Sequence, residues 1–116
     1  MAKVLYVEDN SEVSEIMKDM LEAFFEEVYV AKDGIEGLEL YKKYKPELVI
    51  SDILMPRMNG INLAKEIRKI NKDAKIVLIT ADNDENYYLE AKKLGVLGYF
   101  RKPFDFAELQ YLFNNL

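Results

Sequence analysis

Short apolar segments alternate with longer segments of helical periodicity along the whole chain. The apolar segments are rich in β-branched and aromatic residues and are too short for helices; they cover residues 4–7, 28–31, 48–51, 76–80 and 97–100. Most of them lack polar alternation, which is typical of strands buried on both faces of a parallel sheet.

The first segment between these strands has the clearest helical pattern. Its apolar residues recur at the spacing of one face of an amphipathic helix: Val13, Ile16, Met17, Met20, Leu21 and Phe24. Three further helices are predicted to start at acid pairs with capping-box spacing: Asp33 with Glu36, Asp82 with Glu85, and Asp105 with Glu108. Asn59 before Gly60 is another plausible N-cap, and Gly95 is expected to end a helix in the left-handed conformation.

Regular alternation of strand and helix predicts an α/β fold, a doubly wound five-stranded parallel sheet with helices on both faces and right-handed crossovers. The length of 116 residues is near the commonest domain size, so we expect one domain over residues 1–116. In such sheets ligands bind beyond the carboxyl ends of the strands.

Composition removes several classes of function. Sixteen basic and 21 acidic residues give a net charge of −5 with no basic cluster longer than a pair, so we expect no direct binding of nucleic acid. Cysteine and histidine are absent, which excludes disulfides, thiolate chemistry and nearly every zinc site, so any metal must be held by oxygen. Without a signal sequence or an apolar run of membrane length, we expect a cytoplasmic protein with no membrane partner.

Three carboxylates, one hydroxyl and one ammonium gather at the predicted strand ends: Glu8 and Asp9 after the first strand, Asp52 after the third, Thr80 after the fourth and Lys102 past the fifth. Neighbouring carboxylates repel one another unless a cation joins them. An all-oxygen site of this kind suits Mg²⁺ (or Mn²⁺). With that dication in place a phosphoryl group can approach Asp52, whose carboxylate attacks phosphorus to give an acyl phosphate. Thr80 and Lys102 are placed to contact the phosphoryl oxygens.

A purely structural role competes with this interpretation. Asp and Asn often cap helices that follow strands, which would explain Asp9 or Asn10 taken alone. It does not explain Asp52, which ends an apolar run and would face the like charges of Glu8 and Asp9.

Four motifs, in this order and at this spacing, resemble the response-regulator receiver family, the CheY-like superfamily, from Lys3 to the end of the chain. They are Tyr6-Val7-Glu8-Asp9-Asn10, the segment of residues 51–60 that begins Ser51-Asp52 and ends Asn59-Gly60, Ile79-Thr80-Ala81, and Phe100-Arg101-Lys102-Pro103-Phe104. The resemblance implies a flavodoxin-like strand order 2-1-3-4-5. It also implies a phosphoacceptor switch of a two-component phosphorelay, in which a partner sensor histidine kinase or phosphotransfer protein donates a phosphoryl group from phosphohistidine to Asp52. Such a protein is not an enzyme in the ordinary sense, because it catalyses only its own phosphorylation and dephosphorylation.

The same resemblance assigns individual roles around the site. Glu8, Asp9, Asp52 and the backbone carbonyl of Leu54 are implied to hold Mg²⁺, with the longer Glu8 acting through water. Ala81 is implied to accommodate the phosphoryl group, and Pro103 to follow a cis bond. Leu54 and Asp82 are implied to tune how long the phosphoryl group survives, by shielding it or by orienting water; the sequence leaves that choice open.

The signal is implied to pass through Thr80 and Tyr99. Thr80 would move towards the phosphoryl group, and Tyr99 would fill the space it leaves. The surface of the fourth helix, fifth strand and fifth helix would then change for docking of a downstream protein or for homodimerisation, the unphosphorylated chain being a monomer. The alternative is that Tyr99 is an ordinary sheet residue with its hydroxyl in water.

Three rival functions fit less well. A phosphohydrolase with a nucleophilic Asp usually has a second Asp where Leu54 stands, and a flavodoxin-type carrier binds phosphate after the first strand, where Glu8 and Asp9 would repel it. The five glycines form neither a Walker loop nor a GxGxxG segment, against a kinase or NTPase. A stand-alone receiver and a receiver from a longer hybrid kinase or transcription regulator both remain open.

Overall fold

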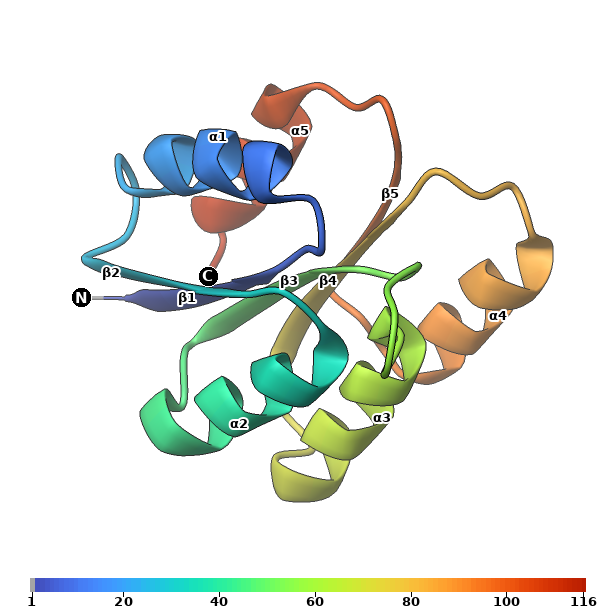
Figure 1. The fold of residues 1–116 in the computed structure, drawn as a ribbon. Coiled ribbons are helices and arrows are strands. Elements are labelled where there is room, and N and C mark those ends of the chain that lie inside the picture. Colours follow the sequence, from blue (N-terminus) through green and yellow to red (C-terminus); the bar gives the residue numbers. More distant parts are fainter. Residues whose placement is uncertain (1) are drawn as a thin grey trace.

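The computed structural model describes residues 2–116 and shows a sheet between two layers of helices (Figure 1). The elements are β1 (Lys3–Val7), α1 (Ser11–Leu21), β2 (Glu27–Ala31), α2 (Gly34–Tyr44), β3 (Leu48–Asp52), α3 (Gly60–Ile70), β4 (Lys75–Thr80), α4 (Glu85–Lys93), β5 (Gly98–Arg101) and α5 (Phe106–Phe113). Within these residues, no helix combines the length and the apolar character needed to span a bilayer.

All neighbouring strands pair in parallel, in the order β2-β1-β3-β4-β5. The predicted fold class and strand order are therefore confirmed, and the carboxyl ends of the five strands lie along one edge of the sheet. Strand boundaries differ from the prediction by one residue in most cases. The predicted start of the last strand at Leu97 is wrong: β5 starts at Gly98, and Leu97, the residue before it, is 40% exposed.

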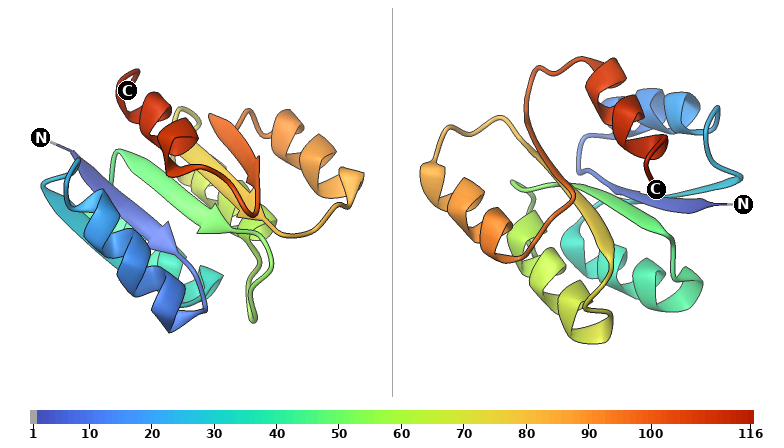
Figure 2. Two further views of the ribbon diagram at one scale, coloured as in Figure 1. Left: turned by 90° about the horizontal axis from the view of Figure 1, so that it is seen from above. Right: turned by 180° about the vertical axis from the view of Figure 1, so that it is seen from behind.

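Alternate residues of the central strands pack into two separate hydrophobic clusters. Val4 and Tyr6 of β1 face the cluster formed with α1 and α5, whereas Leu5 and Val7 face the one formed with α2, α3 and α4. Figure 2 shows these two helix layers on opposite sides of the sheet. Because both faces are covered, apolar residues are needed at successive positions, which explains the missing polar alternation.

The predicted helix starts are right at Asp33, Asn59 and Asp105 and wrong at Asp82. The Asp33 carboxylate accepts from the Glu36 backbone N–H at 2.8 Å, as the capping-box spacing predicts. Helix α4 instead begins at Glu85 and is capped by Asp84, since Asp82 is used in the preceding turn, where it accepts from the Asp84 N–H at 2.7 Å.

The Asp105 carboxylate caps α5 by accepting a hydrogen bond from the Ala107 N–H. The Glu108 backbone N–H donates to the Asp105 carbonyl, but within residues 2–116 no hydrogen bond joins the Glu108 side chain to Asp105. The left-handed conformation predicted for Gly95 is present, with φ of 67°.

The predicted apolar face of the first helix is only partly buried. Met17 and Leu21 face the core, but Ile16 is 61% exposed. The helix ends at Leu21, so Phe24 lies beyond it and packs its ring against Phe106 and Phe113. The helical pattern therefore overstated the buried face at two residues: Phe24 lies past the end of the helix, and Ile16 lies within it but faces solvent.

Candidate functional site

Three carboxylates meet where β1 and β3 end. Glu8, Asp9 and Asp52 can each place an oxygen atom within 4.8 Å of the other two. The register explains the meeting: Val7 pairs with Ser51, so the residues that follow each strand are neighbours. Glu8 is 3% exposed and Asp52 is 7% exposed, so two of the three charges lie largely out of water.

Lys102 supplies the positive charge of this site. Its Nζ donates to Asp52 Oδ2 at 2.9 Å and to Glu8 Oε1 at 3.1 Å. Partial burial disfavours the ammonium, but the hydrogen bonds and negative charges of Asp52 and Glu8 prevail and raise the pKa of Lys102. The Lys102 backbone N–H donates to the Thr80 carbonyl at 2.8 Å, and the bond to Pro103 is cis as the family resemblance implied.

The surroundings of Glu8 disfavour the charged form of its carboxyl group. Burial and the neighbouring charge of Asp52 raise its pKa, while the Asn10 backbone N–H and Lys102 act in the opposite direction. Tyr6 lies two residues earlier and is 2% exposed; burial raises the pKa of its phenol, and the charges of Glu8 and Asp52 add to that effect. The sequence motif contained Tyr6, but no role was predicted for it. Side chains two residues apart in a strand lie on the same face of the sheet, so the sequence could have placed Tyr6 on the same face as Glu8.

The donor set fits a hard divalent cation. One ammonium against three carboxylates leaves an excess of two negative charges at the cluster. Hard cations such as Mg²⁺ bind carboxylate and carbonyl oxygens. Within residues 2–116, no hydrogen bond reaches the carbonyl oxygen of Leu54, so this oxygen is free to accept another partner.

The other predicted residues surround the carboxylates. Thr80 ends β4, the strand beside β3, and is fully buried; its Oγ1 accepts from the Asp82 backbone N–H at 3.0 Å, which leaves its hydroxyl proton available. Ala81 and Pro103 line an open hollow of about 550 Å³ together with Lys102 and Tyr6. The predicted chemical positions therefore lie at one edge of the sheet.

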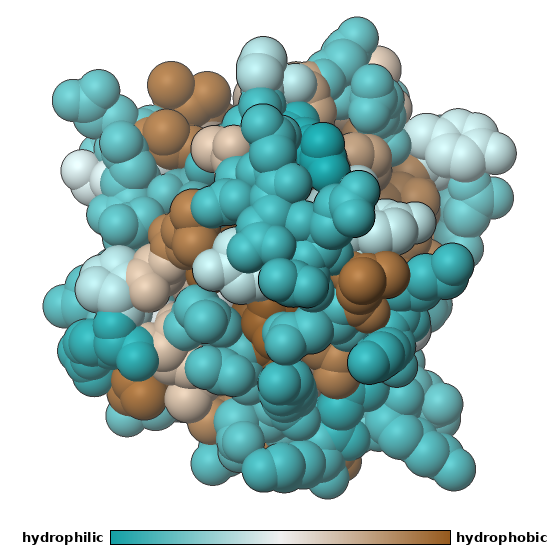
Figure 3. All heavy atoms as spheres, turned by 90° about the vertical axis from the view of Figure 1, so that its right-hand side faces the viewer, coloured by the Kyte–Doolittle hydropathy of each residue, from teal (hydrophilic) through white to brown (hydrophobic). Residues whose placement is uncertain are grey.

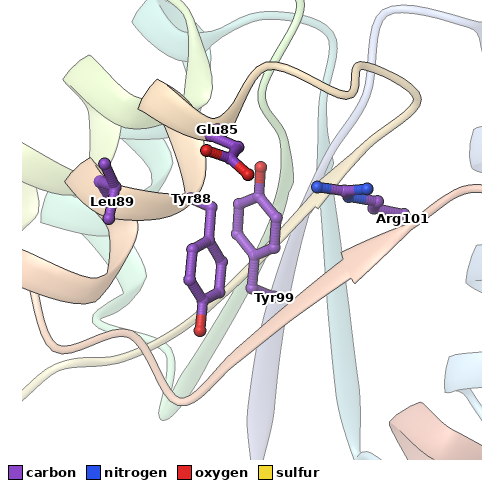
Figure 4. Close-up of a pocket in the computed structure, with 5 residues that line it drawn as sticks. All are labelled: Glu85, Tyr88, Leu89, Tyr99 and Arg101. Atoms are coloured by element: carbon purple, nitrogen blue, oxygen red, sulfur yellow. The ribbon is translucent and has the colours of Figure 1, made fainter.

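Tyr99 lies in β5, and its side chain lies beside helix α4. Its ring meets the Tyr88 ring edge-on at 5.4 Å, and both line a pocket of about 540 Å³ with Glu85, Leu89 and Arg101 (Figure 4). Among the described residues 2–116 its buried hydroxyl has no hydrogen-bond partner, so the alternative that this hydroxyl lies in water is wrong. Burial raises the pKa of Tyr99. On the side of the molecule that carries α4, Figure 3 shows hydrophobic side chains as separate spots among hydrophilic ones.

Comparison with known proteins agrees with this architecture. Residues 4–114 match the response regulator receiver domain family. The chemotaxis protein CheY of Halobacterium salinarum is 39% identical over 105 residues, which cover 90% of this chain and 88% of that protein. An uncharacterized response regulatory protein of Staphylococcus epidermidis is 36% identical over 119 residues, which cover all of this chain but 47% of that protein. The chain thus spans about half the length of some curated relatives.

Solved structures give the same result. The response regulator protein TrrA of Thermotoga maritima, crystallised in complex with Mg²⁺-BeF, superposes with a TM-score of 0.87 at 35% identity, covering 99% of this chain and 98% of that one. Both the sequence match and the superposition extend over nearly the whole chain. The chain belongs to the family of receiver domains of two-component response regulators.

Proposed function

We propose that the chain is a phosphoacceptor switch in which Asp52 receives a phosphoryl group from the phosphohistidine of a sensor histidine kinase or phosphotransfer protein. The observation that supports this most directly is the Lys102 ammonium, which lies 2.9 Å from Asp52 Oδ2 inside a cluster of three carboxylates. The crystallised relative binds Mg²⁺-BeF, which supports a divalent metal beside a phosphoryl-sized group in this family.

The residues divide the chemistry between them. Glu8, Asp9, Asp52 and the Leu54 carbonyl would hold Mg²⁺ or Mn²⁺, which when bound neutralises charge on the phosphoryl oxygens. An oxygen of Asp52 forms a bond to phosphorus while the phosphorus–nitrogen bond of the donor breaks, and the bonding electron pair leaves with the imidazole nitrogen. Lys102 transfers its hydrogen bond from Asp52 to a phosphoryl oxygen, and Thr80 donates its free hydroxyl proton to another. Ala81, whose side chain is a single methyl group, leaves the space that the phosphoryl group needs.

The response would pass from Thr80 to Tyr99. A buried hydroxyl without a hydrogen-bond partner costs about 1–3 kcal/mol. The inward conformation of Tyr99 has this cost, and a small structural change nearby can remove it. Movement of Tyr99 would alter the surface of α4, β5 and α5, where a downstream protein or a second copy of the chain would bind.

The test is phosphorylation of the purified chain by acetyl phosphate, followed by intact mass. With Mg²⁺ we expect a gain of one phosphoryl group, which is lost when the metal is chelated and in Asp52→Asn. Asp73→Asn, an exposed acid outside the carboxylate cluster, is the matched control and should gain the group normally. A folded wild-type protein that gains nothing would contradict the proposal and favour a docking module that works without phosphorylation.

A further inference from the structure

An ion pair joins the loop after Asp52 to the start of helix α2. Arg57 Nη1 lies 3.2 Å from Asp33 Oδ2. The Asp33 side chain is 4% exposed and also caps α2, while the Arg57 side chain is 58% exposed. Most exposed ion pairs contribute little, but a pair with one nearly buried carboxylate is less screened by solvent.

The backbone at Arg57 is in a conformation that needs support. Its φ of 70° lies in the left-handed region, which side chains with a β-carbon disfavour. Such residues persist where their surroundings hold them in place. The next residue, Met58, accepts a hydrogen bond from the Gly34 N–H at 3.2 Å, and a β-carbon at Gly34 would lie 2.2 Å from the Met58 carbonyl oxygen. Two consecutive residues of this loop therefore bind two consecutive residues at the start of α2.

These contacts lie beside a stretch of the loop with little backbone support: at residues 54–56, the hydrogen bond from the Met58 N–H to the Pro56 carbonyl at 2.9 Å is the only backbone hydrogen bond among the described residues. At its start the Ile53 N–H donates to the Ile79 carbonyl at 2.8 Å, and at its end the Gly60 N–H donates to the Ile53 carbonyl at 2.9 Å. Leu54 lies between the anchor at Ile53 and the anchor at Arg57; it is 44% exposed, and the next residue, Met55, packs against the core. The position of the Leu54 carbonyl thus depends on the contacts on both sides of it.

We propose that Asp33 and Arg57 are positioning residues of the metal site. Neither belongs to the carboxylate cluster; together they fix the left-handed turn at Arg57 and so aim the Leu54 carbonyl at the cation. This inference rests on the proposed function, because it assigns a role to Leu54 as a ligand. Outer contacts that orient metal ligands commonly change affinity by at least tenfold.

Two variants separate this role from general stability. Arg57→Gly removes the ion pair but fits the left-handed conformation without strain. Asp33→Asn removes the charge and keeps the helix cap, because an asparagine oxygen also accepts from the Glu36 N–H. Lys45→Gly is the matched control: Lys45 is the other non-glycine residue of residues 2–116 with positive φ, and it lies at the far end of α2, outside the site.

The experiment measures the Mg²⁺ dissociation constant of the full chain by NMR titration, from the amide signals of Asp9 and Asp52. We expect Arg57→Gly and Asp33→Asn to raise it about tenfold and Lys45→Gly to leave it unchanged. In metal-free protein, hydrogen exchange of the Met58 and Gly34 amides, which donate to the Pro56 and Met58 carbonyls of the loop, should accelerate in the first two variants only. The unfolding midpoint of Arg57→Gly should not fall, which excludes unfolding as the cause.

The outcomes are distinguishable. Wild-type affinity in both variants, or unchanged exchange of the Met58 and Gly34 amides, would overturn the positioning role and leave the proposed function intact. Wild-type protein that binds no Mg²⁺ at these signals would overturn both.

Discussion

Lys102 and Asp52 are 50 residues apart in sequence, and their side chains meet at 2.9 Å. The contact crosses from the end of β5 to the end of β3, past the intervening strand β4. It depends on the backbone hydrogen bond between Lys102 and Thr80, which ties the residue after β5 to the end of β4. The proposed acceptor carboxylate therefore already faces the cation that would later contact its phosphoryl group.

Lys102→Met should destabilise the metal-free protein. The change leaves Glu8 and Asp52 buried without their cation, and since Lys102 is itself 30% exposed we expect a loss of about 1–2 kcal/mol, below the range for fully buried pairs. The loss should shrink in acid, where Glu8, whose pKa is raised, becomes neutral. Urea unfolding at neutral and acidic pH measures it, with Lys69→Met, an exposed cation of α3, as control. Equal losses at both pH values would contradict the electrostatic explanation.

Glu8 should make stability fall as the pH rises. Burial and the charge of Asp52 raise its pKa above the ordinary value of 4.5, so the folded state holds this proton more tightly than the unfolded state does. Its contribution is present at low pH and is lost between 4.5 and the raised pKa. We expect the difference in free energy of unfolding between wild type and Glu8→Gln to decrease across this interval. A difference that grows with pH would show that Lys102 lowers the Glu8 pKa instead.

Gly60→Ala should disturb the site more than Gly95→Ala. A β-carbon at Gly60 would lie 2.3 Å from the Asp52 carbonyl oxygen and 2.9 Å from the Ile53 α-carbon. Both are backbone atoms, which cannot move away as the end of a flexible side chain can. We expect Gly60→Ala to cost about 3 kcal/mol, at the upper end of overpacking effects, and to reduce phosphoryl uptake. Gly95 has open space around it and a φ of 67°, so alanine there should cost about 1 kcal/mol with normal uptake. Equal denaturation midpoints for the two variants would contradict this prediction and show that the backbone near Asp52 can shift at little cost in free energy.

Tyr99→Phe should stabilise the chain by about 1 kcal/mol, because it removes a buried hydroxyl without a partner and keeps the ring contact with Tyr88. Tyr41→Phe is the matched control, since the Tyr41 hydroxyl accepts from Asn71 at 3.4 Å and its loss should bring no gain. Thermal or urea unfolding distinguishes the two. A less stable Tyr99→Phe would mean that the hydroxyl is hydrogen-bonded in solution.

The gathering of Glu8, Asp9 and Asp52 could be predicted because register in a parallel sheet brings the residues after neighbouring strands together. The start of α4 could not be predicted as well. Asp82, Asn83 and Asp84 are all good N-cap residues, and the choice depends on the Thr80 hydroxyl, which binds the Asp82 N–H.

The contact between Asp33 and Arg57 had no sequence signal. It joins two loops, and neither strand nor helix periodicity determines where a loop side chain points. Tyr99 shows the same limit, because the sequence predicted its strand but not that its hydroxyl would be buried without a partner.

Locating the phosphoryl group tests the central claim most directly. The chain would be treated with acetyl phosphate and Mg²⁺, then with hydroxylamine, which converts an acyl phosphate into a stable hydroxamate, and the modified residue would be identified by peptide mass spectrometry. We predict modification of Asp52 alone, absent without Mg²⁺. Modification of Glu8, Asp9 or any other residue in place of Asp52 would contradict the account.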